Sequence, residues 1–257
     1  MVFQNGGRRR ATEHWNLGGE SIEIVSSYQY LGVELIHPPP RLSFTKHVER
    51  KAQSAKFALN NIWGRLFANP AVPLKAKSEV FNATIRAILC YTSPSWGFQE
   101  YAKAEGVQLM YIRKLFRLPK FSPNYILYLE TGVDTISAFT LEAHLKYLKK
   151  VAHLPDTRLP KLIAMEVMRS GVSWAGHLGR LATGLGVIDG LHPLSFESIR
   201  LQAAEILERF KEHKKQWFWQ RAMDSERRGQ PSDDVRSDPH VPGENLVDVI
   251  EEAGSLL

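Results

Sequence analysis

The stretch SSYQYLGVELIHPPPRLSFTKHVERKAQSAKFALNNIWGRL, residues 26–66, changes from one backbone period to another and so decides the fold. Its first part, Tyr28 to Leu35, alternates at period two, as does the preceding run from Ser21 to Val25. Such alternation is typical of half-buried strands, and it predicts two strands with Gly32 in the interior of the second. The prolines at 38–40 end the sheet, because proline has no amide hydrogen to donate to a ladder.

From Ser43, a plausible N-cap, the period becomes helical. Apolar residues recur at helical spacing on one face: Phe44, Val48, Ala52, Ala55, Leu59, Ile62 and Leu66. The opposite face carries Lys46, Arg50, Gln53, Asn60 and Asn61, with Lys51 and Lys56 on its flanks and Glu49 as its acid. This pattern predicts an amphipathic helix of about six turns with a basic, amide-rich outer face.

The rest of the chain is also patterned for helices. We expect a second helix from near Pro73 to Pro94 and a third over residues 99–118, which together with the first make a bundle. The fold class is therefore mainly α, in four parts. Residues 1–37 form a β-hairpin, 42–120 a thumb-like three-helix bundle, 121–223 a second helical region, and 224–257 a disordered acidic tail.

The net charge of +6 over 257 residues is unevenly distributed. Residues 1–120 hold 17 Lys and Arg against 8 Asp and Glu, whereas residues 222–257 hold 3 against 9. A basic N-terminal half suggests a polyanionic partner such as nucleic acid, although an ordinary solvated basic surface would look the same. With no apolar run of about 20 residues and no signal pattern, we expect an intracellular protein of the nucleus or cytoplasm and no membrane partner.

Catalytic and metal-binding motifs are not evident. The single cysteine, Cys90, excludes a Cys-based zinc site and is expected to be a small core residue. The histidines lack metal-ligand spacing, and no glycine-rich stretch ends in the Gly-Lys-Ser/Thr of a phosphate loop. The one Asp-Asp pair, Asp233-Asp234, lies in the acidic tail without flanking strands. We therefore predict no catalytic residue, metal site or cofactor in this chain.

Several boxes occur in a characteristic order. Trp15 and Gly18-Gly19-Glu20-Ser21-Ile22-Glu23-Ile24-Val25 precede Tyr28-Gln29-Tyr30-Leu31-Gly32-Val33, and Leu42-Ser43-Phe44-Thr45-Lys46-His47-Val48 follows. Further on come Ile88-Leu89-Cys90-Tyr91-Thr92-Ser93-Pro94-Ser95-Trp96-Gly97 and the run from Leu109 to Pro119. Over residues 1–150 this order resembles the region after the palm of LINE-type (non-LTR) retrotransposon reverse transcriptases. Thr92 departs from that family, which usually has Gly after the tyrosine.

The resemblance implies that Tyr30, Leu31 and Gly32 lie at a primer grip, where Gly32 would let the primer approach closely. It also implies that the helix carrying Lys46, Arg50, Gln53, Lys56 and Asn60 is a thumb helix facing the template–primer duplex. Trp96-Gly97 would pack the thumb onto the region that follows.

The function implied by the resemblance is that of a C-terminal fragment of an RNA-directed DNA polymerase. Such a fragment would bind an RNA–DNA or RNA duplex through its backbone and would partner the missing palm and fingers. The parent enzyme would use Mg²⁺, but this chain is expected to be inactive alone, and Met1 to be an internal methionine of a longer frame. Two alternatives stay open: a non-functional retrotransposon relic, and a host-adopted helical module that binds a protein.

Overall fold

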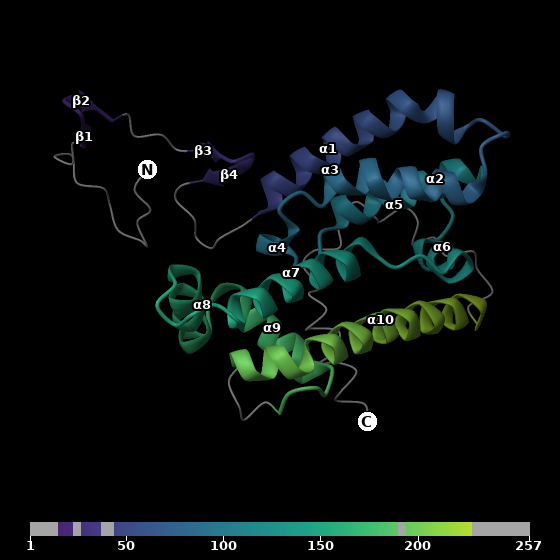
Figure 1. Ribbon diagram of the computed structural model, residues 1–257. Helices are drawn as coiled ribbons and strands as arrows, with labels where there is room; N and C mark the ends of the chain where they lie inside the picture. The colour runs from purple at the N-terminus through teal and green to yellow at the C-terminus, as the bar shows by residue number, and fades with distance from the viewer. Residues whose placement is uncertain (1–14, 23–26, 37–43, 190–193, 228–257) are drawn as a thin grey trace.

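The computed structural model describes residues 15–22, 27–36, 44–189 and 194–227 (Figure 1). The expected cap at Ser43 and residues 228–257 of the expected acidic tail lie outside these ranges. The expected start of that tail at residue 224 was wrong, because residues 224–227 belong to the last helix. The described chain is mainly helical with small N-terminal hairpins, which confirms the predicted fold class. No helix in the described ranges combines the length and the apolar character needed to cross a membrane.

Two short antiparallel hairpins precede the helices. In the first, β1 (Asn16–Leu17) pairs with β2 (Glu20–Ser21) around a turn at Gly18-Gly19. In the second, β3 (Ser27–Tyr30) pairs with β4 (Val33–Ile36) in a register that sets Tyr28 opposite Leu35 and Tyr30 opposite Val33. The run from Tyr28 to Leu35 is thus two strands joined by a turn, and the expectation of one strand with an interior glycine was wrong.

The first group of helices forms the upper layer of Figure 1. It comprises α1 (Thr45–Ile62), α2 (Leu74–Val80), α3 (Ala87–Leu89), α4 (Ser93–Trp96) and α5 (Ala102–Leu115), with two π-helical segments, η1 (Trp63–Phe67) and η2 (Phe81–Arg86). The apolar face of α1 is buried as the periodicity predicts, with Val48, Ala55 and Leu59 fully inaccessible to solvent. The aromatic rings of Phe67, Phe81 and Tyr111 pack together where the π-helical segments meet α5.

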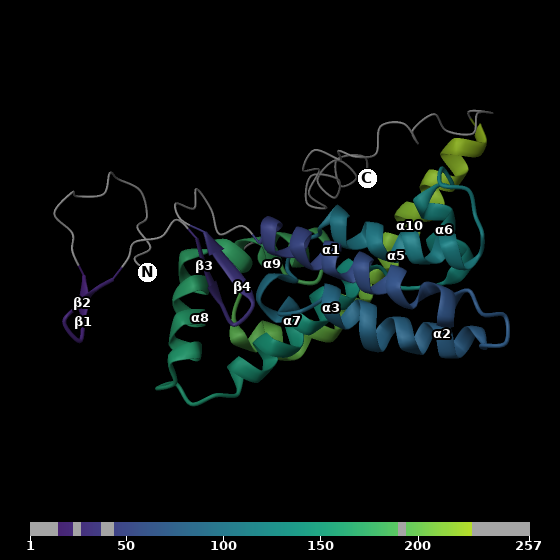
Figure 2. The same cartoon turned by 90° about the horizontal axis from the view of Figure 1, so that it is seen from above.

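The second group lies below the first and is seen from above in Figure 2. It comprises α6 (Asn124–Thr131), α7 (Ile136–Ala152), α8 (Leu159–Ser170), α9 (Ser173–Gly184) and the long α10 (Phe196–Arg227). Leucines of α7 and α9 pack against Ile199, Ala203, Ile206 and Phe210 of α10 to form a second core. The first core also reaches this layer, because Phe218 of α10 stacks on Tyr128 with ring centroids 5.0 Å apart.

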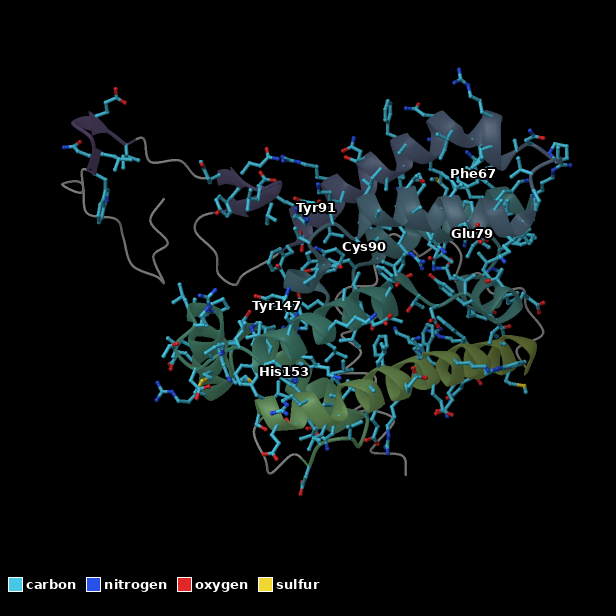
Figure 3. The ribbon with its side chains drawn as sticks, in the orientation of Figure 1. Phe67, Glu79, Cys90, Tyr91, Tyr147 and His153 are labelled. Carbon is cyan, nitrogen blue, oxygen red and sulfur yellow. The ribbon has the colours of Figure 1, made fainter. Side chains whose placement is uncertain are left out.

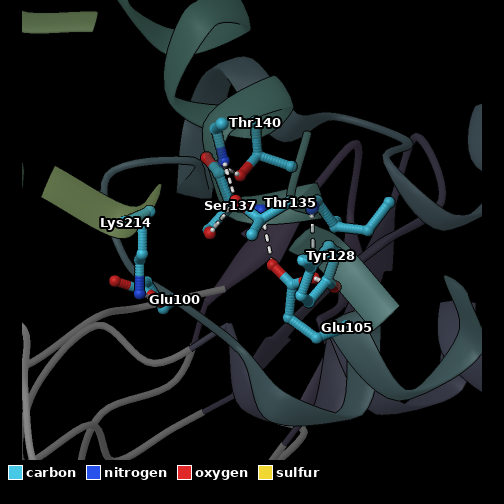
Figure 4. Close-up of polar contacts among 9 residues, drawn as sticks. Glu100, Glu105, Tyr128, Thr135, Ser137, Thr140 and Lys214 are labelled. Atoms are coloured by element: carbon cyan, nitrogen blue, oxygen red, sulfur yellow. Dashed lines mark hydrogen bonds and ion pairs between the residues drawn. The ribbon is translucent and has the colours of Figure 1, made fainter. Parts of the chain in front are cut away.

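Several contacts join the groups, and two of them involve Gly97 and Glu105. Gly97, at the end of α4, lies directly against the carbonyl of Thr140 in α7. The Glu105 carboxylate accepts hydrogen bonds from the first amides of α7, Ile136 and Ser137, and from the Tyr128 hydroxyl (Figure 4). Burial raises the pKa of Glu105, while these three hydrogen bonds favour its ionised form. The expected packing role of Trp96-Gly97 fits this arrangement, since Trp96 is also buried.

Candidate nucleic-acid interface

The outer face of α1 presents the side chains predicted to contact nucleic acid. Lys46, Arg50, Gln53, Lys56 and Asn60 are all exposed, while the opposite face of the helix is buried in the first core. Lys46 and Asn60 are separated by about 21 Å along the helix axis at 1.5 Å per residue. That length corresponds to about six base pairs of a duplex that rises 3.4 Å per pair. We call these five side chains the α1 stripe.

The cations of the α1 stripe differ in their partners. Arg50 forms an ion pair with Glu34 of β4, with a distance of 3.2 Å between Nη2 and the carboxylate. Lys46 and Lys56 form no ion pair with the described residues, and Glu49 is an exposed acid on the same side of the helix. A guanidinium has five N–H donors, so Arg50 can bind an anion while it is paired with Glu34.

Asn60 connects the α1 stripe to α5. Its Oδ1 accepts a hydrogen bond from the Lys114 ammonium at 3.1 Å, and the same ammonium lies 4.3 Å from the centre of the Trp63 ring. The basic end of α5 therefore continues the stripe beyond Asn60. The sequence showed that this helix end is basic but gave no sign that it lies beside α1.

The β3–β4 turn is built from Leu31 and Gly32. Both have a left-handed backbone, with φ of +47° and +77°. A two-residue hairpin turn with two positive φ angles suits the right-handed twist of the strands, and its first position normally favours Asn, Asp or Gly. The leucine at this position is instead strained and 72% exposed, and neighbouring Tyr30 is exposed as well.

Tyr91, which is labelled in Figure 3, connects this turn to the helices. Its hydroxyl donates a hydrogen bond of 2.8 Å to the Leu31 carbonyl, and its ring lies against the Gly32 backbone. A Cβ at position 32 would be 3.1 Å from Tyr91 Cε1. Among the described residues, the side chain that lies beside Gly32 is therefore that of Tyr91. Lys51 of α1 covers the Tyr91 ring, with its ammonium 4.2 Å from the centroid.

The backbone carbonyl of Tyr91 is also fixed by hydrogen bonds. It accepts hydrogen bonds from the buried Trp96 indole at 3.0 Å and from the Thr92 hydroxyl at 2.7 Å. His47, buried on α1, lies 3.4 Å from the same carbonyl, and desolvation lowers the pKa of this histidine. Thr92, which stands where the resembling family has Gly, has a φ of +57°. A left-handed backbone explains why glycine would be favoured at this position.

The structure thus places the eight predicted site residues on the β3–β4 hairpin and along the exposed face of α1, which the hairpin contacts through Glu34. Tyr30, Leu31 and Gly32 lie beside the N-terminal half of α1, and the α1 stripe runs away from them toward α5. Sequence reasoning missed Glu34 and the anchoring role of Tyr91. The signal for Tyr91 was its place in the Ile-Leu-x-Tyr box, but the contact with Leu31 joins residues 60 apart.

The described residues offer no arrangement for metal chemistry. Among them, no three His, Cys, Asp or Glu side chains come close enough to hold a metal ion. Asp233-Asp234 and His192 lie outside the described ranges. Cys90 is buried, and burial raises the pKa of its thiol to about 12, so it stays protonated at neutral pH. We therefore assign no catalytic step to these residues.

Comparison with known proteins adds no relative: no protein-family model, curated protein or solved structure matches this chain.

Proposed function

We propose that the chain is the thumb and connection region of a LINE-type RNA-directed DNA polymerase, and that it binds an RNA–DNA or RNA duplex through the sugar-phosphate backbone. The observation that carries this proposal is the α1 stripe. It combines three cations and two amides on one exposed helix face about 21 Å long. The order of sequence boxes that resembles the LINE family supports the same assignment.

The chemistry of the stripe suits a duplex read without sequence preference. Lysine and arginine neutralise phosphates, while glutamine and asparagine can donate to or accept from sugar hydroxyls. An A-form duplex presents its 2′-hydroxyls in a wide, shallow minor groove that such a face can approach. None of these contacts distinguishes one base pair from another.

The hairpin tip supports the proposal independently. An exposed leucine in a left-handed conformation is unfavourable both for its backbone and for its apolar surface. Residues held in such conformations are concentrated at functional sites. Leu31 beside Tyr30 would meet the primer strand at the N-terminal end of the α1 stripe. The Mg²⁺ and the carboxylates of the parent polymerase would belong to the palm, and the present residues would only position the duplex.

The test is charge reversal on the intact chain. We expect the wild-type protein to bind a fluorescent RNA–DNA hybrid with an affinity that falls steeply as salt rises. In the triple variant Lys46→Glu, Arg50→Glu, Lys56→Glu, the slope of log K against log salt should become shallower by about 2.7, at about 0.9 per lost phosphate contact.

A matched control reverses the same number of charges elsewhere. Lys149, Arg200 and Lys215 are exposed on α7 and α10, and their replacement by Glu changes the net charge equally. This control should keep most of the affinity and the salt slope. Equal affinities for the wild type and the stripe variant, or equal losses in the two triple variants, would refute the assignment of the α1 stripe.

A further inference from the structure

The segment between α5 and α6, residues 116–121, places aromatic and basic side chains together on the surface. All six residues of Phe116-Arg117-Leu118-Pro119-Lys120-Phe121 are exposed. The Phe116 side chain is 46% exposed and the Phe121 side chain 66%, although phenylalanine is usually buried. Apolar residues that are grouped on the surface in this way are typical of a binding site. We call residues 116–121 the α5–α6 loop.

Hydrogen bonds fix the backbone of the α5–α6 loop. The Arg113 guanidinium donates to the Ser122 carbonyl at 2.7 Å and to Asn124 Oδ1 at 2.5 Å. The Leu118 amide donates to the Arg113 carbonyl at 2.8 Å. Arg117 has a left-handed backbone with a φ of +56°, a conformation that is unfavourable outside glycine and is concentrated at functional sites. The loop is therefore ordered before it binds a ligand, which lowers the entropic cost of binding.

The surface around the α5–α6 loop is basic. Residues 50–78 contain six Lys and Arg, residues 106–129 contain four, and neither stretch has an Asp or Glu. Tertiary packing brings the two stretches together, because the Lys114 ammonium lies 3.1 Å from Asn60 Oδ1 and 4.3 Å from the centre of the Trp63 ring. A ligand of this surface should therefore be anionic.

Single-stranded nucleic acid combines the two properties that this surface would select. Its phosphates are anionic, and its unpaired bases have open faces that stack on aromatic side chains. In the α5–α6 loop, Arg117 and Lys120 form no ion pair with the described residues, and they stand in the sequence between Phe116 and Phe121. A duplex would use these cations but not the rings, because its bases are already stacked on one another.

We propose that the α5–α6 loop binds a single strand of RNA or DNA, with bases stacked on Phe116 and Phe121 and phosphates on Arg117 and Lys120. The basic end of α5 contacts Asn60, the last residue of the α1 stripe, so an unpaired strand leaving a duplex on that stripe would continue onto the loop. This path from the duplex rests on the proposed function, whereas binding of a single strand by the loop does not.

Fluorescence anisotropy with a labelled oligo(dT) of about 16 nucleotides tests binding by the loop itself. Phe121→Ala should weaken binding about tenfold, the loss expected for one stacked base, and should leave the slope of log K against log salt unchanged. Phe121→Tyr keeps an aromatic ring and should keep the affinity. The double variant Arg117→Gln, Lys120→Gln should instead make the slope shallower by about 1.4, at about 0.7 per phosphate contact of a single strand.

The matched control is Tyr147→Ala, which removes an aromatic side chain of 44% exposure from α7. This variant should bind oligo(dT) as the wild type does. Equal affinities of the wild type and Phe121→Ala, or equal losses in Phe121→Ala and Tyr147→Ala, would overturn the proposal. A loss of polyglutamate binding in Phe121→Ala as large as its loss of oligo(dT) binding would overturn it as well, since the loop would then be a site for acidic peptides.

A second comparison separates this proposal from the function proposed for the α1 stripe. The wild type should bind an RNA–DNA hybrid with an unpaired extension of about six nucleotides more tightly than a blunt hybrid. Phe121→Ala should remove this difference and leave the affinity for the blunt hybrid unchanged. If charge reversal on the α1 stripe leaves hybrid binding intact while Phe121→Ala still weakens oligo(dT) binding, the stripe assignment fails and the loop assignment stands. An extension that adds no affinity for the wild type would contradict the path from the stripe to the loop.

Discussion

Replacing Gly97 by alanine should destabilise the protein severely, because the two helical groups touch at this residue. A Cβ built on Gly97 would lie 2.0 Å from the Thr140 carbonyl oxygen of α7 and 2.8 Å from the Ser93 carbonyl oxygen. Real Cβ atoms essentially never approach another heavy atom within 3.0 Å. Both obstructing groups are backbone, so no side chain can rotate to make room.

The size of the effect follows from this geometry. To reach 3.0 Å from the Thr140 oxygen, the added carbon requires α4 and α7 to separate by at least about 1 Å, and interiors packed at crystal density resist such a shift. Overpacking of a buried site costs about 1 to 3 kcal/mol and occasionally more. Because both clashing atoms belong to the backbone, we expect a loss of about 3 kcal/mol. Gly97 has a φ of −70°, so alanine adds no backbone strain of its own.

Urea denaturation followed by circular dichroism measures the difference. The matched control is Gly106→Ala in the middle of α5, where an added Cβ has no neighbour within 4 Å. Alanine there should stabilise the protein by about 0.5 to 1 kcal/mol, because glycine is a poor helix former. The same chemical change is thus expected to have opposite signs at the two positions. A Gly97→Ala protein within 1 kcal/mol of the wild type would show that α4 and α7 do not pack as described.

Three further outcomes can be measured on the same chain. His144 donates from Nδ1 to the Pro94 carbonyl, and burial lowers its pKa to about 4, below the 6.5 of an unfolded histidine. The stabilisation from neutral His144 is therefore complete above pH 6.5 and is lost as the pH falls toward 4. Between pH 7 and pH 4.5 the wild type should lose about 2.5 kcal/mol of unfolding free energy that the His144→Asn variant does not lose. Urea titrations of both proteins at the two pH values measure this difference. Thr92→Val should lower the unfolding free energy, measured by the same urea titration, by about 1 kcal/mol, because valine loses the hydrogen bond from the Thr92 hydroxyl to the Tyr91 carbonyl and keeps a β-branched residue in the left-handed conformation. Leu31→Asn creates the Asn-Gly turn that hairpins favour and should slow amide exchange in β3 and β4; unchanged exchange would show that the turn is not of this type.

The helices could be predicted from the sequence because the apolar residues on the buried side of each helix recur at the helical period. Val48, Ala52, Ala55 and Leu59 recur at the spacing that one side of a helix requires, and all are buried. The hairpin turn could not be recognised in the same way. Period-two alternation continues through Leu31-Gly32, and leucine is not a residue that normally starts such a turn. The π-helical segments also left no sign in the periodicity.

The candidate site was predictable only in part, for a related reason. The exposure of Lys46, Arg50 and Lys56 follows from the helical period alone. The ion pair of Arg50 with Glu34 and the bond from Tyr91 to Leu31 depend on tertiary packing, which brings the hairpin to the start of α1. Sequence patterns report which side of an element is buried, but they do not report which other element covers it.

The packing of helix α10 determines how the protein unfolds and whether its fragments associate. It contributes Ile199, Ile206 and Phe210 to the second core and Phe218 to the first. Separate polypeptides cut between α5 and α6 would each lack part of an interior that only the other fragment supplies. The two fragments should therefore remain associated without a peptide bond between them, and the intact chain should melt in a single transition.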